Sequence, residues 1–211
     1  DGLCVNEHHQ NAYGIMPSPI VTASALARNT DRVKIAIVGS AFGIREHPLT
    51  LAEEHAMLDC ITGGRIISGM VRGIGCEFYS MGANPAFSHA RFHEAHDLVI
   101  RAWTETGPFA FEGEHYHFEY VNLWPRPYQK PHPPFSMAIS TEGSATVAAN
   151  LDLKPIAWRQ TAKKLRDWVD IYRNARVAAG HECEAPGKDW GVLRQFYVAP
   201  TMEEARKVYE P

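Results

Sequence analysis

The segment Gly64-Arg65-Ile66-Ile67-Ser68-Gly69-Met70-Val71-Arg72-Gly73 decides the fold of this chain. It predicts a short buried strand over residues 65–71 that leads directly into the cation of Arg72. In parallel α/β folds, ligands bind at the carboxyl ends of such strands. Gly69 and Gly73 leave the backbone uncovered there, so a ligand can approach it closely. A solvated arginine at a strand end is the alternative interpretation of the same segment.

Segments typical of strands and helices alternate along the rest of the chain. Six apolar segments predict strands, and they start near Gly2, Val33, Arg65, Phe135, Pro155 and Val192. Helical patterns separate most of them, and only residues 109–122 indicate a hairpin. This alternation predicts an α/β fold with a parallel sheet. We expect an incomplete (β/α)8 TIM barrel of about six to seven parallel strands with a hairpin insertion; a doubly wound sheet is the alternative.

Polar residues at the ends of the expected strands favour the barrel. They are Glu7-His8-His9, Gly39-Ser40, Arg72 and Ser140-Thr141. The sequence has neither the G-x-G-x-x-G motif of dinucleotide-binding folds nor a P-loop. A complete barrel usually needs about 250 residues, whereas this chain has 211. We therefore expect one partial barrel domain over residues 1–211.

Composition excludes several classes of function. The formal net charge is −3 and no basic run occurs, which argues against nucleic-acid binding. No apolar run approaches the ~20 residues of a membrane span. The four cysteines, Cys4, Cys60, Cys76 and Cys183, lack C-x-x-C spacing. This pattern fits reduced thiols better than a disulfide framework, so we expect a cytoplasmic protein.

An ordered set of short motifs covers nearly the whole chain. The set comprises Asn6-Glu7-His8-His9, Ser18-Pro19, His47-Pro48, Ala52-Glu53, Leu58-Asp59, Gly64-Arg65, Arg72-Gly73, Glu77, Gly82, Arg91, Glu94, Phe111-x-Gly113 and Pro125-x-Pro127-x-Gln129-x-Pro131-x-Pro133-Pro134. In this order and spacing the motifs resemble the bacterial luciferase-like monooxygenase family. The resemblance implies a (β/α)8 barrel that binds a flavin at the carboxyl ends of its strands. It also implies that the first strand and helix, and everything after the seventh strand, are missing here.

The resemblance implies an FMN-dependent monooxygenase, an oxidoreductase of the flavoprotein class. A separate NAD(P)H:flavin reductase would supply reduced FMN, and O2 and a small organic substrate would be the reactants. One alternative is hydride transfer with the deazaflavin F420 on the same fold, and another is a non-catalytic flavin-binding relative. The family resemblance also implies a homodimer, or a heterodimer with a paralogue, formed through the helices expected at residues 19–28 and 48–60.

The histidine pair His8-His9 is the candidate catalytic group. Because adjacent strand residues point to opposite faces, only one of the two can face the mouth of the barrel. A histidine there can exchange protons near neutral pH; two ordinary loop histidines are the alternative. The resemblance implies that His8 is the acid/base residue beside the flavin ring and that His9 is its partner in the pocket.

A phosphate site is predicted at Arg72 and Arg91, because two guanidinium groups suit a dianion. The segment Ser140-Thr141-Glu142-Gly143-Ser144 lies between a strand and a helix, where hydroxyls and free N–H groups bind anions. A plain helix N-cap is the alternative for this segment. The resemblance assigns Arg72, Arg91, Ser140, Thr141 and Ser144 to the flavin phosphate.

Gly39, Ser40 and Val71 are the candidates for contact with the flavin ring. The resemblance implies a cis peptide between Gly39 and Ser40 beneath the ring, with Val71 as an apolar wall. An ordinary β-bulge at the glycine is the alternative. The spacing of His89, His93 and His96 favours a packed or solvated helical face over a metal site, so we expect no metal.

Overall fold

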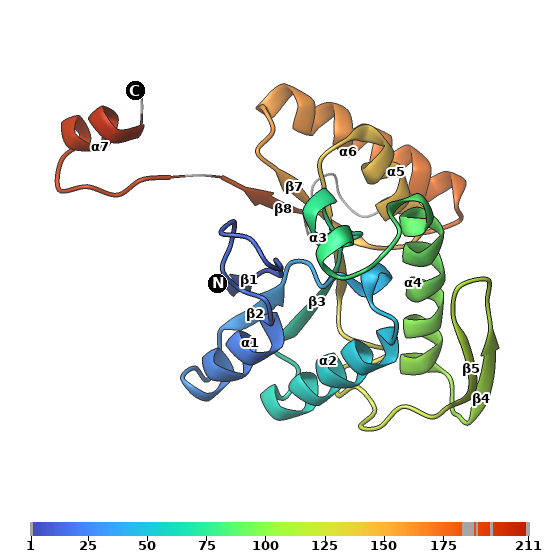
Figure 1. Ribbon diagram of the computed structural model, residues 1–211. Coiled ribbons are helices and arrows are strands. Elements are labelled where there is room, and N and C mark those ends of the chain that lie inside the picture. The colour runs from blue at the N-terminus through green and yellow to red at the C-terminus, as the bar shows by residue number, and fades with distance from the viewer. Residues whose placement is uncertain (1, 183–187, 189, 195, 210–211) are drawn as a thin grey trace. The chain divides into compact units, whose positions relative to one another are not determined.

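The structure is a computed structural model, which describes residues 2–182, 188, 190–194 and 196–209. The chain divides into two compact units, Asp1–Ala138 and Ile139–Pro211 (Figure 1). The single domain over residues 1–211 stays a prediction. Of the four cysteines, Cys4, Cys60 and Cys76 are free thiols, and Cys183 lies outside the described residues.

A parallel ladder forms the centre of the first unit. Its strands are β1 (Gly2–Val5), β2 (Lys34–Ile37), β3 (Ile66–Met70) and β6 (Phe135–Ile139), adjacent in that order. The three pairs formed in this order are all parallel. The apolar side chains of β3 and β6 are mostly buried, which explains their continuous apolar sequence.

Helices α1 (Pro19–Arg28) and α2 (Pro48–Thr62) lie side by side against this ladder (Figure 1). Ser18 starts α1, where its Oγ accepts from the Val21 amide at 3.3 Å. Gly63, with a φ of 62°, ends α2 in the left-handed conformation that glycine adopts freely. Their inward faces share one apolar core with the strands, made by Val5, Ala23, Ile35, Ile37, Leu58 and Ile66.

Four more helical segments of the first unit follow β2 and β3. They are the short 3-10 turns η1 (Phe42–Ile44) and η2 (Pro85–Phe87), helix α3 (Gly75–Ser80) and the long helix α4 (Ser88–Thr104). Sequence periodicity predicted only the last of these. The loops after β2 and β3 therefore carry more regular structure than their sequences indicate.

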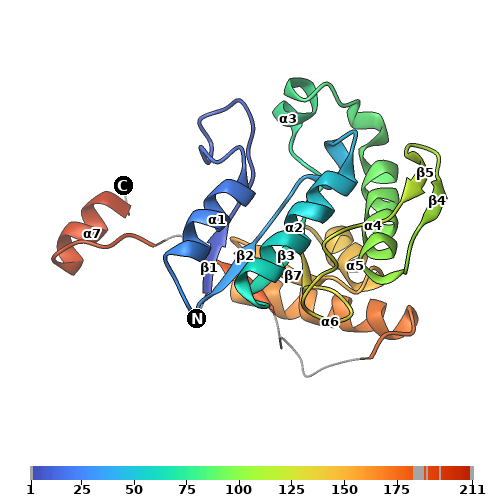
Figure 2. The same ribbon diagram turned by 90° about the horizontal axis from the view of Figure 1, so that it is seen from below.

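The predicted hairpin is confirmed. Strands β4 (Phe109–Glu112) and β5 (His117–Val121) pair antiparallel. In both views the hairpin lies along α4, on the side away from β3 (Figures 1 and 2). Glu94 of α4 ties down its turn, because its carboxylate accepts from the amides of Glu114, His115 and Tyr116 at 2.6–3.1 Å.

The second unit repeats the strand–helix pattern. It contains α5 (Glu142–Asn150), β7 (Lys154–Trp158), α6 (Ala162–Ala178), β8 (Gly191–Leu193) and α7 (Met202–Tyr209). Strands β7 and β8 are parallel. The Tyr172 hydroxyl of α6 donates to the Leu153 carbonyl at 3.0 Å. The strand expected over residues 192–199 is shorter than predicted and ends at Leu193.

Among the described residues, six strands lie in parallel pairs and one hairpin interrupts them, as the sequence predicts. No helix in this part of the chain is both long enough and apolar enough to cross a membrane.

Candidate functional site

His8 follows the carboxyl end of β1 and is oriented by a buried carboxylate. Its Nδ1 lies 2.8 Å from Oε1 of Glu77, whose side chain is 3% exposed. A carboxylate accepts hydrogen bonds, so Nδ1 carries the hydrogen and Nε2 of the neutral ring is an acceptor. In the described part of the chain, Nε2 makes no hydrogen bond. His8 is therefore held in one tautomer with a free basic nitrogen.

His9 turns to a different carboxylate. Its Nε2 lies 2.7 Å from Oε1 of the buried Glu7. The same oxygen accepts from Nη2 of Arg45 at 2.8 Å, and Oε2 of Glu7 accepts from the Ala41 amide at 3.4 Å. The side chains of the two histidines thus have separate carboxylate partners, while the His9 amide also donates to Oε1 of Glu77 at 3.3 Å. Because β1 ends at Val5, this arrangement belongs to the loop and not to the strand. Because its Nε2 is hydrogen-bonded to Glu7, His9 belongs to the buried polar group formed with Glu7 and Arg45.

The loop between β1 and α1 covers one side of His8. The ring of Tyr13 meets the His8 ring edge-on, with centroids 4.7 Å apart. Gly14 has a φ of 66°, and a Cβ on it would lie 2.7 Å from Cδ2 of His8. Only glycine fits this close approach without displacement. The His8 amide also donates to the Met16 carbonyl at 3.1 Å, which fixes the loop.

The predicted cis peptide between Gly39 and Ser40 is wrong, because that peptide is trans. The alternative, a bulge, is what the register shows. Ala36 of β2 pairs with Ile67, whereas Ser40 bridges to Met70. The β2 side advances four residues while β3 advances three, so one extra residue lies before Ser40. The bulge places Gly39 directly against Val71, and both Gly39 and Ser40 are buried.

Gly39 packs on Val71, which follows β3. A Cβ on Gly39 would lie 2.7 Å from Cγ1 of Val71. Val71 is half-buried, and its amide donates to the Ser40 carbonyl at 3.0 Å. The structure thus brings together the three residues predicted to meet a flavin ring.

Arg72 contacts the first turn of α4, whereas Arg91 belongs to that helix and bonds to the segment at η1. The exposed Arg72 reaches Ser88 Oγ with Nη1 at 3.4 Å and also contacts the ring of His89. Arg91 donates to the carbonyls of Gly43 and Arg45 at 2.9 and 2.8 Å. Nη1 is the guanidinium nitrogen of Arg91 that bonds neither carbonyl. Arg72 is therefore accessible to a phosphate, whereas two nitrogens of the Arg91 guanidinium already bond to backbone carbonyls.

Arg91 also lies over the ring of Tyr116, with Cζ 4.7 Å from the ring centroid. The Tyr116 hydroxyl donates to the same two carbonyls, those of Gly43 and Arg45, at 3.2 and 3.0 Å. Burial raises the pKa of Tyr116 to about 12, so the hydroxyl stays protonated as a donor. Together Arg91 and Tyr116 fix η1 to α4.

In the second unit, the segment Ser140–Ser144 forms a helix N-cap. Oγ1 of Thr141 accepts from the Ser144 amide at 3.1 Å. Oγ of Ser144 accepts from the amides of Ser140 and Thr141, both at 3.0 Å. This is the alternative interpretation weighed for the sequence, and it uses the hydroxyls of Thr141 and Ser144 within the cap. Their role toward a phosphate stays a prediction.

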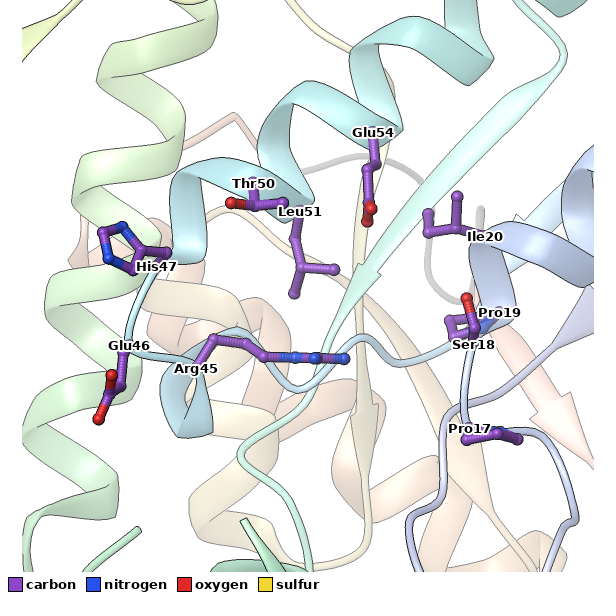
Figure 3. A pocket seen from close by; sticks show the side chains of 10 residues that line it. All are labelled: Pro17, Ser18, Pro19, Ile20, Arg45, Glu46, His47, Thr50, Leu51 and Glu54. Carbon is purple, nitrogen blue, oxygen red and sulfur yellow. The ribbon is translucent and has the colours of Figure 1, made fainter. Parts of the chain in front are cut away.

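A cavity of about 310 Å³ opens between the starts of α1 and α2 (Figure 3). Ser18, Arg45, Thr50 and Glu54 are among the residues that line it. Burial raises the pKa of Glu54, and the nearby Arg45 cation opposes that shift. None of the predicted site residues lines this cavity. Arg45 nevertheless connects it to Glu7, and through Glu7 to His9.

Comparison with known proteins identifies the family. The model of the luciferase-like monooxygenase family matches residues 1–211. The chain belongs to the luciferase-like monooxygenase family. Its fold is the (β/α)8 barrel of that family, of which the described residues supply six parallel strands.

Two luciferase-like relatives have curated functions. The chain is 28% identical, over 97% of its length, to the oxygenase component of a flavin-dependent trigonelline monooxygenase from Acinetobacter baylyi, and covers 56% of it. It is also 28% identical, over 90% of its length, to an FMNH2-dependent dimethylsulfone monooxygenase from Pseudomonas putida, and covers 51% of it. The chain thus spans about half the length of these relatives.

Two further matches are informative. The crystal structure of the monooxygenase RslO1 from Streptomyces bottropensis matches 98% of this chain and 63% of its own, with a TM-score of 0.87 and 30% identity. An F420-dependent glucose-6-phosphate dehydrogenase from Kineococcus radiotolerans is 28% identical over 61% of this chain, which covers 40% of that protein. Luciferase-like proteins similar to this chain therefore include users of both cofactors.

Two carboxylates of the candidate site, Glu7 and Glu77, belong to the sequence motifs, but the sequence analysis assigned them no function. Glu7 and Glu77 hold His9 and His8, respectively. Glu77 lies 69 residues from His8 in the sequence, so its contact with His8 arises only in the folded chain. The one signal that the sequence offers is the place of each acid within a motif. If such an acid is buried, it nearly always has a charged or hydrogen-bonded partner.

Proposed function

We propose that this protein is an FMN-dependent monooxygenase that uses O2 to oxidise a small organic substrate. A separate NAD(P)H:flavin reductase supplies the reduced FMN. The observation that carries the proposal is His8, whose Nδ1 is hydrogen-bonded to the buried Glu77 while Nε2 has no hydrogen-bond partner among the residues that the structure describes. In a monooxygenase family, this geometry is suited to moving a proton at one defined atom.

The half-buried Val71 and the exposed Arg72, which follow β3 beside the bulge, fit a flavin, because they offer an apolar side chain to the ring and a cation to the phosphate. Gly39 and Gly69 are buried, and a Cβ on Gly69 would lie 2.1 Å from the Ile37 carbonyl oxygen, so these glycines let the chain segments pack closely. In the first unit, the ring would be held by Gly39, Ser40 and Val71, and the phosphate by Arg72 and Arg91. For Ser140, Thr141 and Ser144 of the second unit, contact with the phosphate stays a prediction. Reduced flavin, when bound, supplies the electrons that activate O2.

The chain's own residues orient the reactants and control one proton. Nε2 of His8 accepts or donates that proton, and Glu77 keeps the ring in the required tautomer. Tyr13 and Gly14 cover the His8 ring and limit the access of water to it. Val71 adds an apolar wall that favours the flat face of a ring.

The test is a reconstitution with FMN, NADH and a flavin reductase, in which 18O2 and a panel of small organic substrates are supplied. We expect one 18O atom in a product, detected by mass spectrometry. His8→Asn should lower the rate of product formation by about 10²–10⁴-fold and leave the FMN dissociation constant within about threefold.

The control is His117→Asn, an exposed histidine of the hairpin, which should leave the rate unchanged. A protein that binds neither oxidised nor reduced FMN would contradict the proposal. So would a His8→Asn variant with the rate of the unmodified protein.

F420-dependent hydride transfer is the second candidate, because one relative is named as an F420-dependent dehydrogenase. The two cofactors are separated by mass spectrometry of the small molecules released from the purified protein. Release of F420 in place of FMN would move the proposal to hydride transfer. Retention of FMN without any oxidised product from the panel would favour the non-catalytic flavin-binding alternative.

A further inference from the structure

His55 is a fully buried imidazole that lies outside the site residues described above. It lies on the inward face of α2 and is 0% exposed. Its Nε2 is 3.1 Å from Oγ of Ser40, and its Nδ1 is 2.9 Å from Oγ of Ser68. Both serines are also 0% exposed. The ring therefore bridges helix α2 to Ser40, which follows β2, and to Ser68 in the middle of β3.

A neutral ring fits this position. Burial lowers the pKa of His55 to about 3, so the ring is neutral at physiological pH. A neutral imidazole has one donor and one acceptor nitrogen, and a serine hydroxyl can complement either. An apolar side chain would be the usual occupant of such a helix position, since a buried polar group without a partner destabilises the fold. The two hydrogen bonds are what make the histidine compatible with the core.

The first of these bonds ends at the bulge. Ser40 is the residue at which the ladder resumes after the extra residue on the β2 side. Its amide donates to the Gly69 carbonyl at 2.9 Å, and its carbonyl accepts from the Val71 amide at 3.0 Å. Any shift of Ser40 would thus move both Gly39 and Val71.

The second bond ends on the neighbouring strand. Ser68 belongs to β3, and its carbonyl accepts from Oγ of Ser136 at 2.9 Å, which continues the polar contacts to β6. The bulge is therefore held by one side-chain hydrogen bond from α2, whose histidine is in turn fixed to β3, and by the backbone bonds of Ser40 to Gly69 and Val71. The phenyl ring of Phe42, 5.5 Å from the imidazole between centroids, packs on the same group.

We propose that His55 is a positioning residue, which fixes the bulge through the bridge Ser40–His55–Ser68 and so sets the surface at Gly39 and Val71 where the flavin ring would lie. The second half of this inference rests on the proposed function. The first half, the fixing of the bulge, concerns the apoprotein alone. The experiment therefore has one measurement for each half.

The variants are His55→Leu, which keeps an apolar core and removes both bonds, and Ser40→Ala, which removes one. The matched control is Trp103→Phe, in the same buried layer, which removes the 3.0 Å bond from Trp103 Nε1 to the Ala52 carbonyl of α2. The first measurement is hydrogen exchange of the Ser40 and Val71 amides in the apoprotein, with the Ile35 amide as the reference before the bulge.

We expect both variants to speed exchange at Ser40 and Val71 about three- to tenfold, the loss of one hydrogen bond. Exchange at Ile35 should not change. Trp103→Phe should lower the melting temperature without this local effect. Adding Ser40→Ala to His55→Leu should add nothing further, because both remove the same bond. Unchanged exchange in Ser40→Ala overturns the proposal even where His55→Leu does not fold.

The second measurement is the FMN dissociation constant, followed by flavin fluorescence. We expect it to rise about three- to tenfold in both variants and to stay unchanged in Trp103→Phe. Unchanged affinity together with faster exchange would overturn the role toward the flavin. Failure of the unmodified protein to bind FMN would contradict the proposed function instead, and the exchange rates would still decide whether His55 fixes the bulge.

Discussion

The partly buried side chain of Glu54 has a pKa that its surroundings shift. Burial raises its pKa, so the ionised form is less favourable in the folded than in the unfolded protein. Stability from this group is complete below the unfolded pKa and is lost as the pH rises through the folded value. The ionised Glu54 therefore destabilises the fold at pH 7.

Replacing the charge should reverse this effect. We expect Glu54→Gln to unfold at a higher temperature than the unmodified protein at pH 7. The gain in the free energy of unfolding should be less than about 1 kcal/mol, because the side chain is partly solvated. The gain should shrink at pH 4. Glu119→Gln, at an exposed position of the hairpin away from Glu54, is the control and should have no effect. Equal gains at both pH values would contradict the explanation.

His55 has the opposite pH dependence. Its pKa in the fold is about 3, lowered by burial from 6.5, so the unfolded chain binds a proton that the folded chain does not. Stability from this group is complete above pH 6.5 and falls as the pH decreases toward 3. The slope is about 1.4 kcal/mol per pH unit at most.

Urea unfolding at pH 7, 6 and 5 measures this slope. We expect the free energy of unfolding of His55→Leu to fall less steeply with decreasing pH than that of the unmodified protein, so that the two curves converge. His117→Leu, at an exposed position, should follow the unmodified curve. Parallel curves for His55→Leu would mean that the imidazole is not buried neutral.

The candidate residues differ in how far the sequence could predict them. His8, His9 and Arg72 stand directly after apolar strands, so their place at the carboxyl ends followed from the pattern. The carboxylates that orient the histidines did not, because the contact between His8 and Glu77 joins residues far apart in the chain. His55 lies in a helical pattern of apolar residues, where periodicity gives no reason to expect a polar bridge.

Among the elements, the start of α5 tests the phosphate site against the helix cap. The N-cap residue Thr141 accepts from the Ser144 amide through its hydroxyl, and an aspartate can replace it in that role. Thr141→Asp should therefore leave the melting temperature within a few degrees of the original value. If a phosphate binds there, the added negative charge should weaken FMN binding about tenfold or more.

Thr141→Ala is the companion variant. It should cost about 1 kcal/mol of stability through loss of the cap and affect FMN binding less than the aspartate. An aspartate variant with unchanged FMN affinity would show that this segment is a cap and nothing more.

Element prediction succeeded where the segments were long or strongly apolar. The bounds of α1, β3 and β6 lie close to those expected from periodicity and composition. η1 and α3 were not foreseen, since three to six residues are too few to show a helical period. The cis peptide between Gly39 and Ser40 was implied by the resemblance alone, and the structure has a trans peptide and a bulge there instead.

In the whole molecule, α1 and α2 present apolar side chains to solvent. Val21 is 68% exposed, Met57 53% and Ile61 64%. Exposed apolar groups on adjacent helices are typical of an interface. We propose that the protein forms a homodimer, or a heterodimer with a paralogue, that buries more than ~1,000 Å² through these helices.

Sedimentation at micromolar concentration tests this assembly. We expect a dimer for the unmodified protein and a shift toward monomer for the double variant Met57→Lys and Ile61→Lys, because two charges would enter the contact. Val177→Lys, at a residue of the second unit that is 62% exposed, is the control and should not change the assembly. A monomeric unmodified protein would contradict the proposal.

The bulge also fixes a parity. Side chains alternate along a strand, so one extra residue reverses which face every later side chain occupies. Ile35, Ile37 and Ile66 pack in the core that α1 and α2 share, and in an unbroken ladder Ser40 would face away from that core. The additional residue turns it back toward His55. The number of residues between Ile37 and Ser40 is thus a requirement separate from their identity: an insertion or deletion there exchanges inside for outside.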